Sequence, residues 1–122
     1  MYFLSVEKSF EAAHYLRGYK GKCENLHGHR FKVVARLKAS KLNNIGLAYD
    51  FTEMKRHLAD VLAQYDHCCL NDVPPFDKIN PSSENLAMSI FDQLRPLFIG
   101  DAGIDSIEVW ESPESCAFYR PD

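Results

Sequence analysis

The sequence predicts an α+β domain in which two helices cover one face of a four-stranded antiparallel sheet. Two strand-like segments open the chain, two segments with helical periodicity follow, and two further strand-like segments close it. This order lacks the βαβ alternation that a parallel sheet requires. The length of 122 residues suits one domain spanning residues 1–122, and a hydrophobic content of 46% is enough for one core.

The first two strands are predicted at residues 2–14 and 31–37. Both segments are rich in aromatic and β-branched side chains, and the first alternates in polarity. Two glycines within residues 17–22 mark a loop, and turn residues follow the second strand at 40–46. The two strands can therefore pair as a hairpin around the loop.

The middle of the chain predicts two helices. Asp50 followed by Glu53 fits a reciprocal capping arrangement at the start of the first helix. Ser82 or Ser83 can cap the second helix, and Pro96 is expected to end it. Apolar residues recur at helical spacing at Phe51, Met54, Leu58, Val61, Leu62 and Tyr65, and again at Leu86, Ala87, Ile90, Phe91 and Leu94.

The last two strands, residues 104–110 and 116–119, are predicted to form a hairpin joined through Ser112 and Pro113. An open sheet of four strands has two edges, and unpaired backbone groups on such edges favour pairing with another chain. We therefore expect the protein to self-associate.

Charge and hydropathy exclude several classes of partner. The chain has 14 Lys and Arg against 17 Asp and Glu, a net charge of −3, so it lacks the positive field of non-specific duplex binding and no nucleic-acid partner is expected. No apolar run has the features of a signal peptide or a membrane span, which predicts a cytoplasmic protein without membrane association. The four cysteines, Cys23, Cys68, Cys69 and Cys116, are expected to be free thiols.

Three histidines predict a metal site. His27 and His29 are separated by one residue, so in an extended backbone both rings leave the same face, and Gly28 is expected to keep bulk out of the gap. In a hairpin, His14 can lie opposite them and supply a third nitrogen. Three histidines with an open fourth position are typical of a catalytic zinc ion.

Cys23 leaves a second interpretation open. It lies four residues before His27, where a nearby cation would favour its thiolate. If Cys23 is a fourth ligand, the site is closed and purely structural; if it is not, the thiolate is available for chemistry. Cys23→Ser distinguishes the two, because zinc is lost in the first case and turnover alone in the second.

Two further motifs are candidates for proton transfer and substrate binding. Asp66 precedes His67, and a carboxylate can orient an imidazole and raise its pKa, which suits a general acid or base. Glu111, at the end of a predicted strand, is a candidate for binding an amidine-like N–H edge. The competing interpretation for both motifs is an exposed surface group, and His57 is expected to be a helix-surface residue.

Taken together, five motifs resemble the 6-pyruvoyltetrahydropterin synthase family, in order and over nearly the whole chain. They are Phe10-Glu11-Ala12-Ala13-His14, Cys23-Glu24-Asn25-Leu26-His27-Gly28-His29, Asp50-Phe51, Asp66-His67-Cys68-Cys69-Leu70-Asn71 and Asn80-Pro81-Ser82-Ser83-Glu84-Asn85.

The resemblance implies the tunnelling fold, ββααββ, whose subunits join their sheets edge to edge into barrels, usually as a trimer that stacks into a hexamer. It implies zinc as the cofactor, with His14, His27 and His29 as the ligands. It makes Cys23 the proton acceptor, His67 with Asp66 the second acid/base group, and Glu111 the anchor of the pterin and a possible member of the proton relay.

Within that family, the three residues between Cys23 and His27 resemble the bacterial 6-carboxy-5,6,7,8-tetrahydropterin synthases of queuosine biosynthesis. This implies 7,8-dihydroneopterin triphosphate as the substrate, and 6-carboxytetrahydropterin, acetaldehyde and triphosphate as products. The alternatives are a 6-pyruvoyltetrahydropterin synthase, which retains the side-chain carbons, and a non-catalytic binding module stabilised by zinc.

Overall fold

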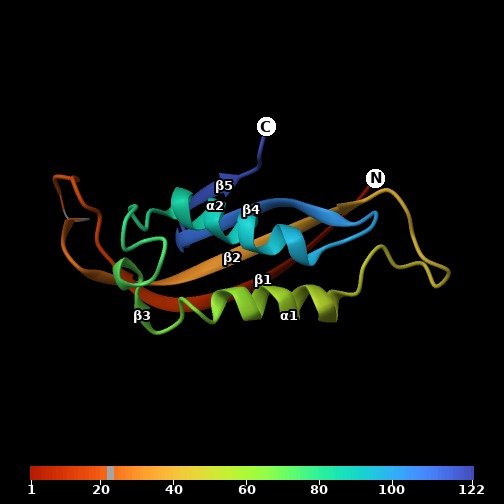
Figure 1. Cartoon of the computed structure of the whole chain (residues 1–122), viewed down its shortest axis with the longest axis horizontal. Helices are drawn as coiled ribbons and strands as arrows, with labels where there is room; N and C mark the ends of the chain where they lie inside the picture. Colours follow the sequence, from red (N-terminus) through yellow and green to blue (C-terminus); the bar gives the residue numbers. More distant parts are fainter. Residues whose placement is uncertain (22–23) are drawn as a thin grey trace.

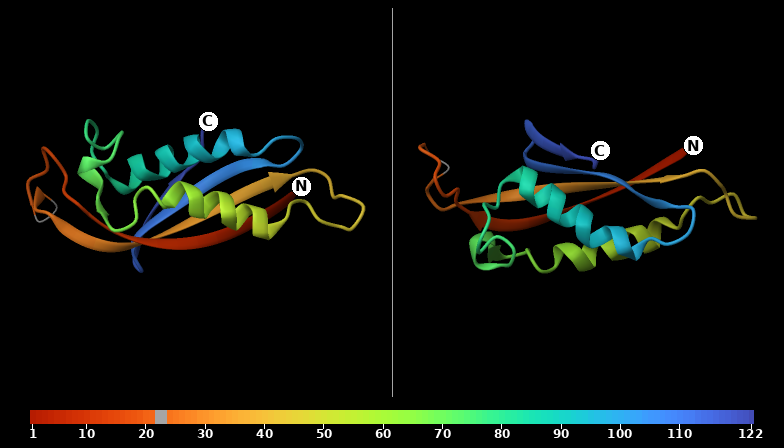
Figure 2. Two further views of the ribbon diagram at one scale, coloured as in Figure 1. Left: turned by 60° about the horizontal axis from the view of Figure 1, so that its bottom comes forward. Right: turned by 45° about the horizontal axis from the view of Figure 1, so that its top comes forward.

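The computed structural model describes residues 1–21 and 24–122, and within them two helices pack on one face of a five-stranded sheet (Figures 1 and 2). The strand order in the sheet is β3-β1-β2-β4-β5. The predicted α+β class and the ββααββ order of the main elements are confirmed. The elements are β1 (Tyr2–His14), β2 (His27–Ala39), α1 (Phe51–Leu62), β3 (Cys68–Cys69), α2 (Ser83–Leu94), β4 (Gly103–Ser112) and β5 (Ser115–Tyr119), with short 3-10 turns η2 (Leu70–Asp72) and η3 (Arg95–Leu97).

The hairpin of β1 and β2 is longer than the sequence predicts. The antiparallel ladder runs without interruption from the pair Tyr2 and Ala39 to the pair His14 and His27. The second strand therefore begins at His27 and not at residue 31, because its partner strand continues to His14. This extension places all three histidines of the predicted metal site within paired strands.

The prediction of four strands is wrong by one. Cys68 and Cys69 form a short strand that runs parallel to β1 beside Ala12 and Ala13. A strand of two residues has no detectable alternation of polarity, and its partner is more than 50 residues away in sequence. It covers only the end of the β1 edge.

Both helices begin where the sequence predicts, but the first is capped differently. The Asp50 carboxylate accepts from the Thr52 N–H, whereas the Glu53 carboxylate pairs with Arg56, so the reciprocal arrangement is not formed. The helix ends at Leu62, and Tyr65 reaches the core from the following turn. In α2, the Ser82 hydroxyl accepts from the backbone N–H of Asn85 at 3.1 Å.

The core lies between the sheet and the helices, and no helix among the described residues covers the other face of the sheet (Figure 2). Inward-facing residues of β1, β2 and β4 meet the apolar stripes of both helices, with Phe31, Val33, Ile107 and Val109 fully buried. Within the described ranges, no helix is long and apolar enough to cross a membrane.

Candidate metal and pterin site

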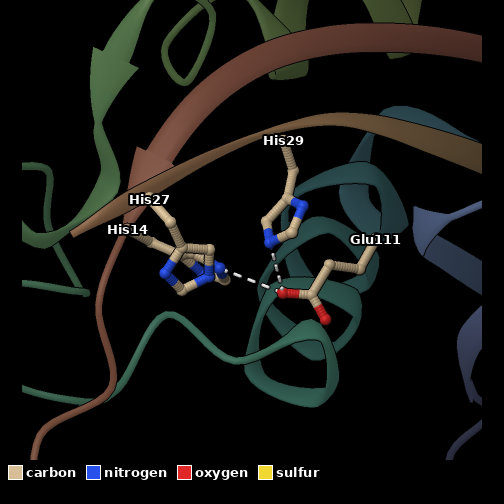
Figure 3. A group of neighbouring side chains, drawn as sticks. All are labelled: His14, His27, His29 and Glu111. Carbon is tan, nitrogen blue, oxygen red and sulfur yellow. Dashed lines mark hydrogen bonds and ion pairs between the residues drawn. The ribbon is translucent and has the colours of Figure 1, made fainter. Parts of the chain in front are cut away.

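Three histidine rings meet at the end of the β1–β2 ladder (Figure 3). His14 pairs with His27 and Ala12 with His29, so the three rings project from the same face of the sheet. The ring centroids of His14 lie 4.6 Å from His27 and 5.2 Å from His29, and those of His27 and His29 lie 4.7 Å apart. The juxtaposition that the hairpin predicts is therefore present.

Backbone carbonyl groups fix the tautomer of two of these rings. Nδ1 of His14 lies 2.8 Å from the Pro81 carbonyl oxygen, and Nδ1 of His27 lies 2.6 Å from that of Asn25. A carbonyl oxygen only accepts, so both Nδ1 atoms must donate. In the neutral rings the lone pair is then on Nε2.

Glu111, from β4, completes the cluster. Its Oε1 lies 3.0 Å from Nε2 of His14 and 3.0 Å from Nε2 of His29. The Nε2 atom of His29 is buried, and its contact with Glu111 lacks the alignment of a hydrogen bond. A nitrogen lone pair and a carboxylate oxygen repel each other at this distance unless a proton or a cation lies between them. The cluster is thus built to hold positive charge.

The donor set fits zinc. One ligand atom from each of His14, His27, His29 and Glu111 lies within 4.8 Å of all the others, and imidazole nitrogen with carboxylate oxygen is a set that zinc accepts. Burial lowers the pKa of His29; the Glu111 carboxylate opposes this effect, and His14 and His27 add to it. The lowered pKa favours the neutral ring that a metal ligand must have.

Gly28 has a different place from the one predicted. It lies between His27 and His29 in the strand and therefore faces the opposite side of the sheet, where it lines a cleft beside His67. A Cβ at Gly28 would meet only the Ala12 carbonyl oxygen, at an ordinary 3.9 Å. The glycine is not needed to make room for the cluster.

Cys23 lies outside the described residues, so neither of its predicted roles is addressed by the structure. In the described ranges Cys68, Cys69 and Cys116 are free thiols, as predicted.

Asp66 and His67 are in contact. Nδ1 of His67 lies 2.9 Å from Oδ1 of Asp66, and that oxygen also accepts from the backbone N–H of Glu11 at 3.0 Å. The bond from Glu11 is the largest cause of a lowered pKa for Asp66; burial acts in the opposite direction, and the bond from His67 adds to the lowering. His67 adopts a φ of 57°, and its N–H donates to the Glu11 carbonyl at 2.6 Å.

The Asp66–His67 pair and the histidine cluster lie on opposite faces of the sheet. Nε2 of His67 is 3.8 Å from the carboxylate of Glu11, which is exposed. The strand neighbours of Glu11, Phe10 and Ala12, are buried on the helix-covered face together with His14, so Glu11 points to the opposite face. His67 lines a cleft of about 560 Å³ on the open face. Within one chain the structure does not bring the pair to the cluster.

A second cleft, of about 360 Å³, opens directly beside Glu111. Ser83 and Glu84 line it from the first turn of α2, and β5 supplies the opposite wall. The Ser83 hydroxyl oxygen is buried without a hydrogen-bond partner in the described structure. From the sequence, Ser83 is expected only as a possible helix cap and Glu84 has no expected role; the signal that could have found them is their position directly after Asn80-Pro81.

His57 is half-buried, and its ring packs edge-on against Phe98 at 5.2 Å between centroids. It therefore has a packing role on the helix and lies away from the candidate site.

The chain is similar to known proteins over nearly its whole length. The model of the 6-pyruvoyl tetrahydropterin synthase family matches residues 3–122. A 6-carboxy-5,6,7,8-tetrahydropterin synthase of Synechocystis sp. is 36% identical over 124 residues, covering 98% of this chain and 93% of the relative. A dihydroneopterin monophosphate aldolase of Pyrococcus furiosus is 32% identical over 108 residues, covering 87% and 86%.

Among solved structures, the 6-pyruvoyl tetrahydropterin synthase of Caenorhabditis elegans is similar at a TM-score of 0.86 and 28% identity, covering all of this chain and 98% of that one. The likeness confirms the tunnelling fold. The chain belongs to the 6-pyruvoyl tetrahydropterin synthase family.

Proposed function

We propose that this protein is a zinc-dependent lyase that converts 7,8-dihydroneopterin triphosphate and water to 6-carboxy-5,6,7,8-tetrahydropterin, acetaldehyde and triphosphate, in queuosine biosynthesis. The observation that carries the proposal is the cluster of three imidazoles and one carboxylate beside an open cleft. The product is chosen because relatives similar over nearly the whole chain are named 6-carboxytetrahydropterin synthase, and because of the spacing between Cys23 and His27.

His14, His27 and His29 would hold the zinc ion through Nε2. Zinc bound there supplies Lewis acidity to the hydroxyl and carbonyl oxygens of the substrate side chain, which makes neighbouring protons more acidic. The carbonyl groups of Pro81 and Asn25 keep the proton of two of these rings on Nδ1, away from the ion.

The pterin ring would lie in the cleft between α2 and β5. Two adjacent N–H donors of a pterin can meet one carboxylate, and the cleft offers two, Glu84 and Glu111. Because Glu111 already contacts the histidines, Glu84 is free to hold the outer edge of the ring while Glu111 bridges the ring and the metal site. The unpaired Ser83 hydroxyl would donate to a ring acceptor.

Proton transfer would require two groups. Cys23 as a thiolate would remove a proton from the side chain, and His67, oriented by the ionised Asp66, would return one as triphosphate leaves and the side chain is cleaved. The sheet separates His67 from the cluster of its own chain, so the pair must act in the site of another copy.

The open edges of the sheet make such an assembly possible. In the described chain, β3 covers β1 only at Ala12 and Ala13, and β5 pairs on one side only, with β4. Edge-to-edge pairing of copies would bring His67 of one chain toward the cleft of the next, and we propose a trimer that stacks into a hexamer.

Incubation of the zinc-loaded protein with dihydroneopterin triphosphate, followed by mass analysis, tests the reaction. Acetaldehyde and a carboxylated tetrahydropterin are expected. A product with all side-chain carbons would indicate a 6-pyruvoyltetrahydropterin synthase, and retro-aldol cleavage to a hydroxymethyl pterin would indicate an aldolase, as the Pyrococcus relative is named. No turnover, with unfolding on chelation and no pterin binding, would support a zinc-stabilised module.

Mixing two inactive variants tests the shared site. His27→Ala removes a cluster ligand and His67→Ala removes the proton donor, so each variant alone is expected to be inactive. In oligomers reassembled at random from equal amounts, about one quarter of the sites would combine an intact cluster with an intact His67 from another chain. Absence of any recovered activity in verified mixed oligomers would contradict the shared site.

A further inference from the structure

We infer that Asn80 is a positioning residue for the metal site: through the carbonyl group of Pro81, it holds the ring of His14 in the tautomer that presents Nε2 to the ion. The inference rests on the proposed metal role of His14. It goes further because it assigns a positioning role to a side-chain amide that, in the described structure, forms its hydrogen bonds with Arg17 and not with the cluster residues.

Hydrogen bonds join the segment from His14 to Arg17 to the segment Asn80-Pro81 at both ends. The side-chain oxygen of Asn80 accepts from the backbone N–H of Arg17 at 2.9 Å, and its side-chain nitrogen donates to the Arg17 carbonyl, also at 2.9 Å. Arg17 follows His14 by three residues, and the ring of His14 donates to the carbonyl of Pro81, the residue after Asn80. One double hydrogen bond thus ties the histidine and its acceptor into one unit.

The far side of this unit is fixed to α2. The side-chain nitrogen of Asn85 donates to the Asn80 carbonyl at 2.9 Å, and Ser82 caps the helix with its hydroxyl. Pro81 is buried, has a ring-restricted φ and has no N–H to form a competing bond. Its carbonyl oxygen therefore has little freedom to move away from His14.

The geometry matters because a histidine can bind metal through either nitrogen. When its acceptor is fixed, the proton stays on Nδ1 and Nε2 is available; without the acceptor, both tautomers are populated and the ring can rotate. Removal of such an outer partner lowers metal affinity by about 10- to 100-fold in other metal sites. We expect an effect of this size from a change that disturbs Pro81.

Asn80→Asp is the sharpest test. Aspartate has the same shape and still accepts from the Arg17 N–H, but it replaces the donor to the Arg17 carbonyl with a second oxygen. The probe is zinc alone, titrated into the metal-free protein against a competing chelator. A second measurement, nitrogen-15 NMR of the histidine rings in the metal-free protein, reports the tautomer of His14 directly.

Two further variants separate positioning from general stability. Arg120→Gln breaks a bond to the buried Asp105 outside the cluster, so it is expected to destabilise the fold without changing zinc affinity. Asn85→Ala removes only the bond to the Asn80 carbonyl; it serves if Asn80→Asp does not fold, with a smaller expected loss in the same direction.

The expected result is a loss of zinc affinity of about 10-fold or more in Asn80→Asp, with a mixed tautomer at His14 and wild-type affinity in Arg120→Gln. Unchanged affinity, an unchanged His14 tautomer, or an equal loss in Arg120→Gln would each overturn the positioning role. If the wild-type protein does not bind zinc, the metal proposal itself fails and this inference with it.

Discussion

Asn71 is predicted to be a main determinant of how β1 ends next to the histidine cluster. It is 4% exposed, and its side chain makes two hydrogen bonds of 3.0 Å to the backbone of Tyr15, one accepted and one donated. Tyr15 directly follows His14, so this amide takes the place of a further strand partner just beyond the last pair of the β1–β2 ladder.

The cost of Asn71→Ala follows from the groups left behind. The substitution removes both bonds and leaves the N–H and the carbonyl of Tyr15 without partners, at about 1–3 kcal/mol for each buried group. Tyr15 is half-buried, so water can reach part of the gap, and we expect a total of about 2–4 kcal/mol. A loss of this size is a large share of the stability of an ordinary domain.

Urea unfolding of the metal-free protein measures this cost, with the single tryptophan, Trp110, as the fluorescent probe. Protein concentration is held constant because assembly would add to the apparent stability. The control is Asn44→Ala, at an exposed residue whose side chain makes no hydrogen bond to the described residues, and a change below about 0.5 kcal/mol is expected there. A cost below about 1 kcal/mol for Asn71→Ala would refute the argument from unpaired backbone groups.

Three further predictions concern groups on other elements. Arg120→Gln removes a 2.7 Å partner of the buried Asp105 and is expected to cost about 1–2 kcal/mol, discounted because Arg120 is half-exposed. Burial alone would raise the pKa of Asp105, but the Arg120 hydrogen bond leads the effects that keep this pKa lowered. The stabilisation is therefore present above the unfolded-state pKa of about 3.9 and is lost as the pH falls through the folded-state pKa. The free energy of unfolding is expected to depend less steeply on acid pH in the variant. His67→Gly is expected to be more stable than His67→Ala by about 1 kcal/mol in thermal unfolding, because glycine adopts the φ of 57° without strain, while both lack turnover. Glu84→Gln is expected to raise KM for the pterin with little change in zinc affinity, and an unchanged KM would remove Glu84 from the cleft's binding role.

Local patterns predicted the elements well where many residues share one period. The helices begin at Phe51 and Ser83 as their caps indicate, and the first strand covers residues 2–14. The early start of β2 was missed because polar residues at 27–30 hide the alternation, although the ladder with β1 continues through them. The short strand at Cys68 depends on a contact with a distant segment, which no local pattern contains.

The residues of the candidate site also differ in how far local sequence patterns predict them. The convergence of the histidines follows from strand geometry and was predictable, because residues two apart share a face. The contact of Glu111 with the cluster depends on β4 lying next to β2, and the cleft residues Ser83 and Glu84 depend on how α2 packs against β4 and β5. These relations are set by tertiary packing, so local patterns can indicate Glu111 as a candidate but cannot predict which residues lie beside it.

The position of the histidines in the strands also explains why the sequence alone indicates a site there. In β1, Phe10, Ala12 and His14 occupy successive inward positions, and in β2 the matching row runs Phe31, His29, His27. The histidines thus stand where the alternation of the strands demands apolar side chains, and the rings of His14 and His29 pack edge-on against Phe31 at 5.4 and 5.5 Å. His14 is buried and His27 and His29 are half-buried. A polar residue in such a row costs stability unless it has a partner, so the convergence of three histidines there is evidence for a ligand. The apolar surroundings that make these positions unfavourable for a polar side chain also have a low dielectric constant, which strengthens any charge interaction formed there. A metal site can therefore lie at the end of a hydrophobic core.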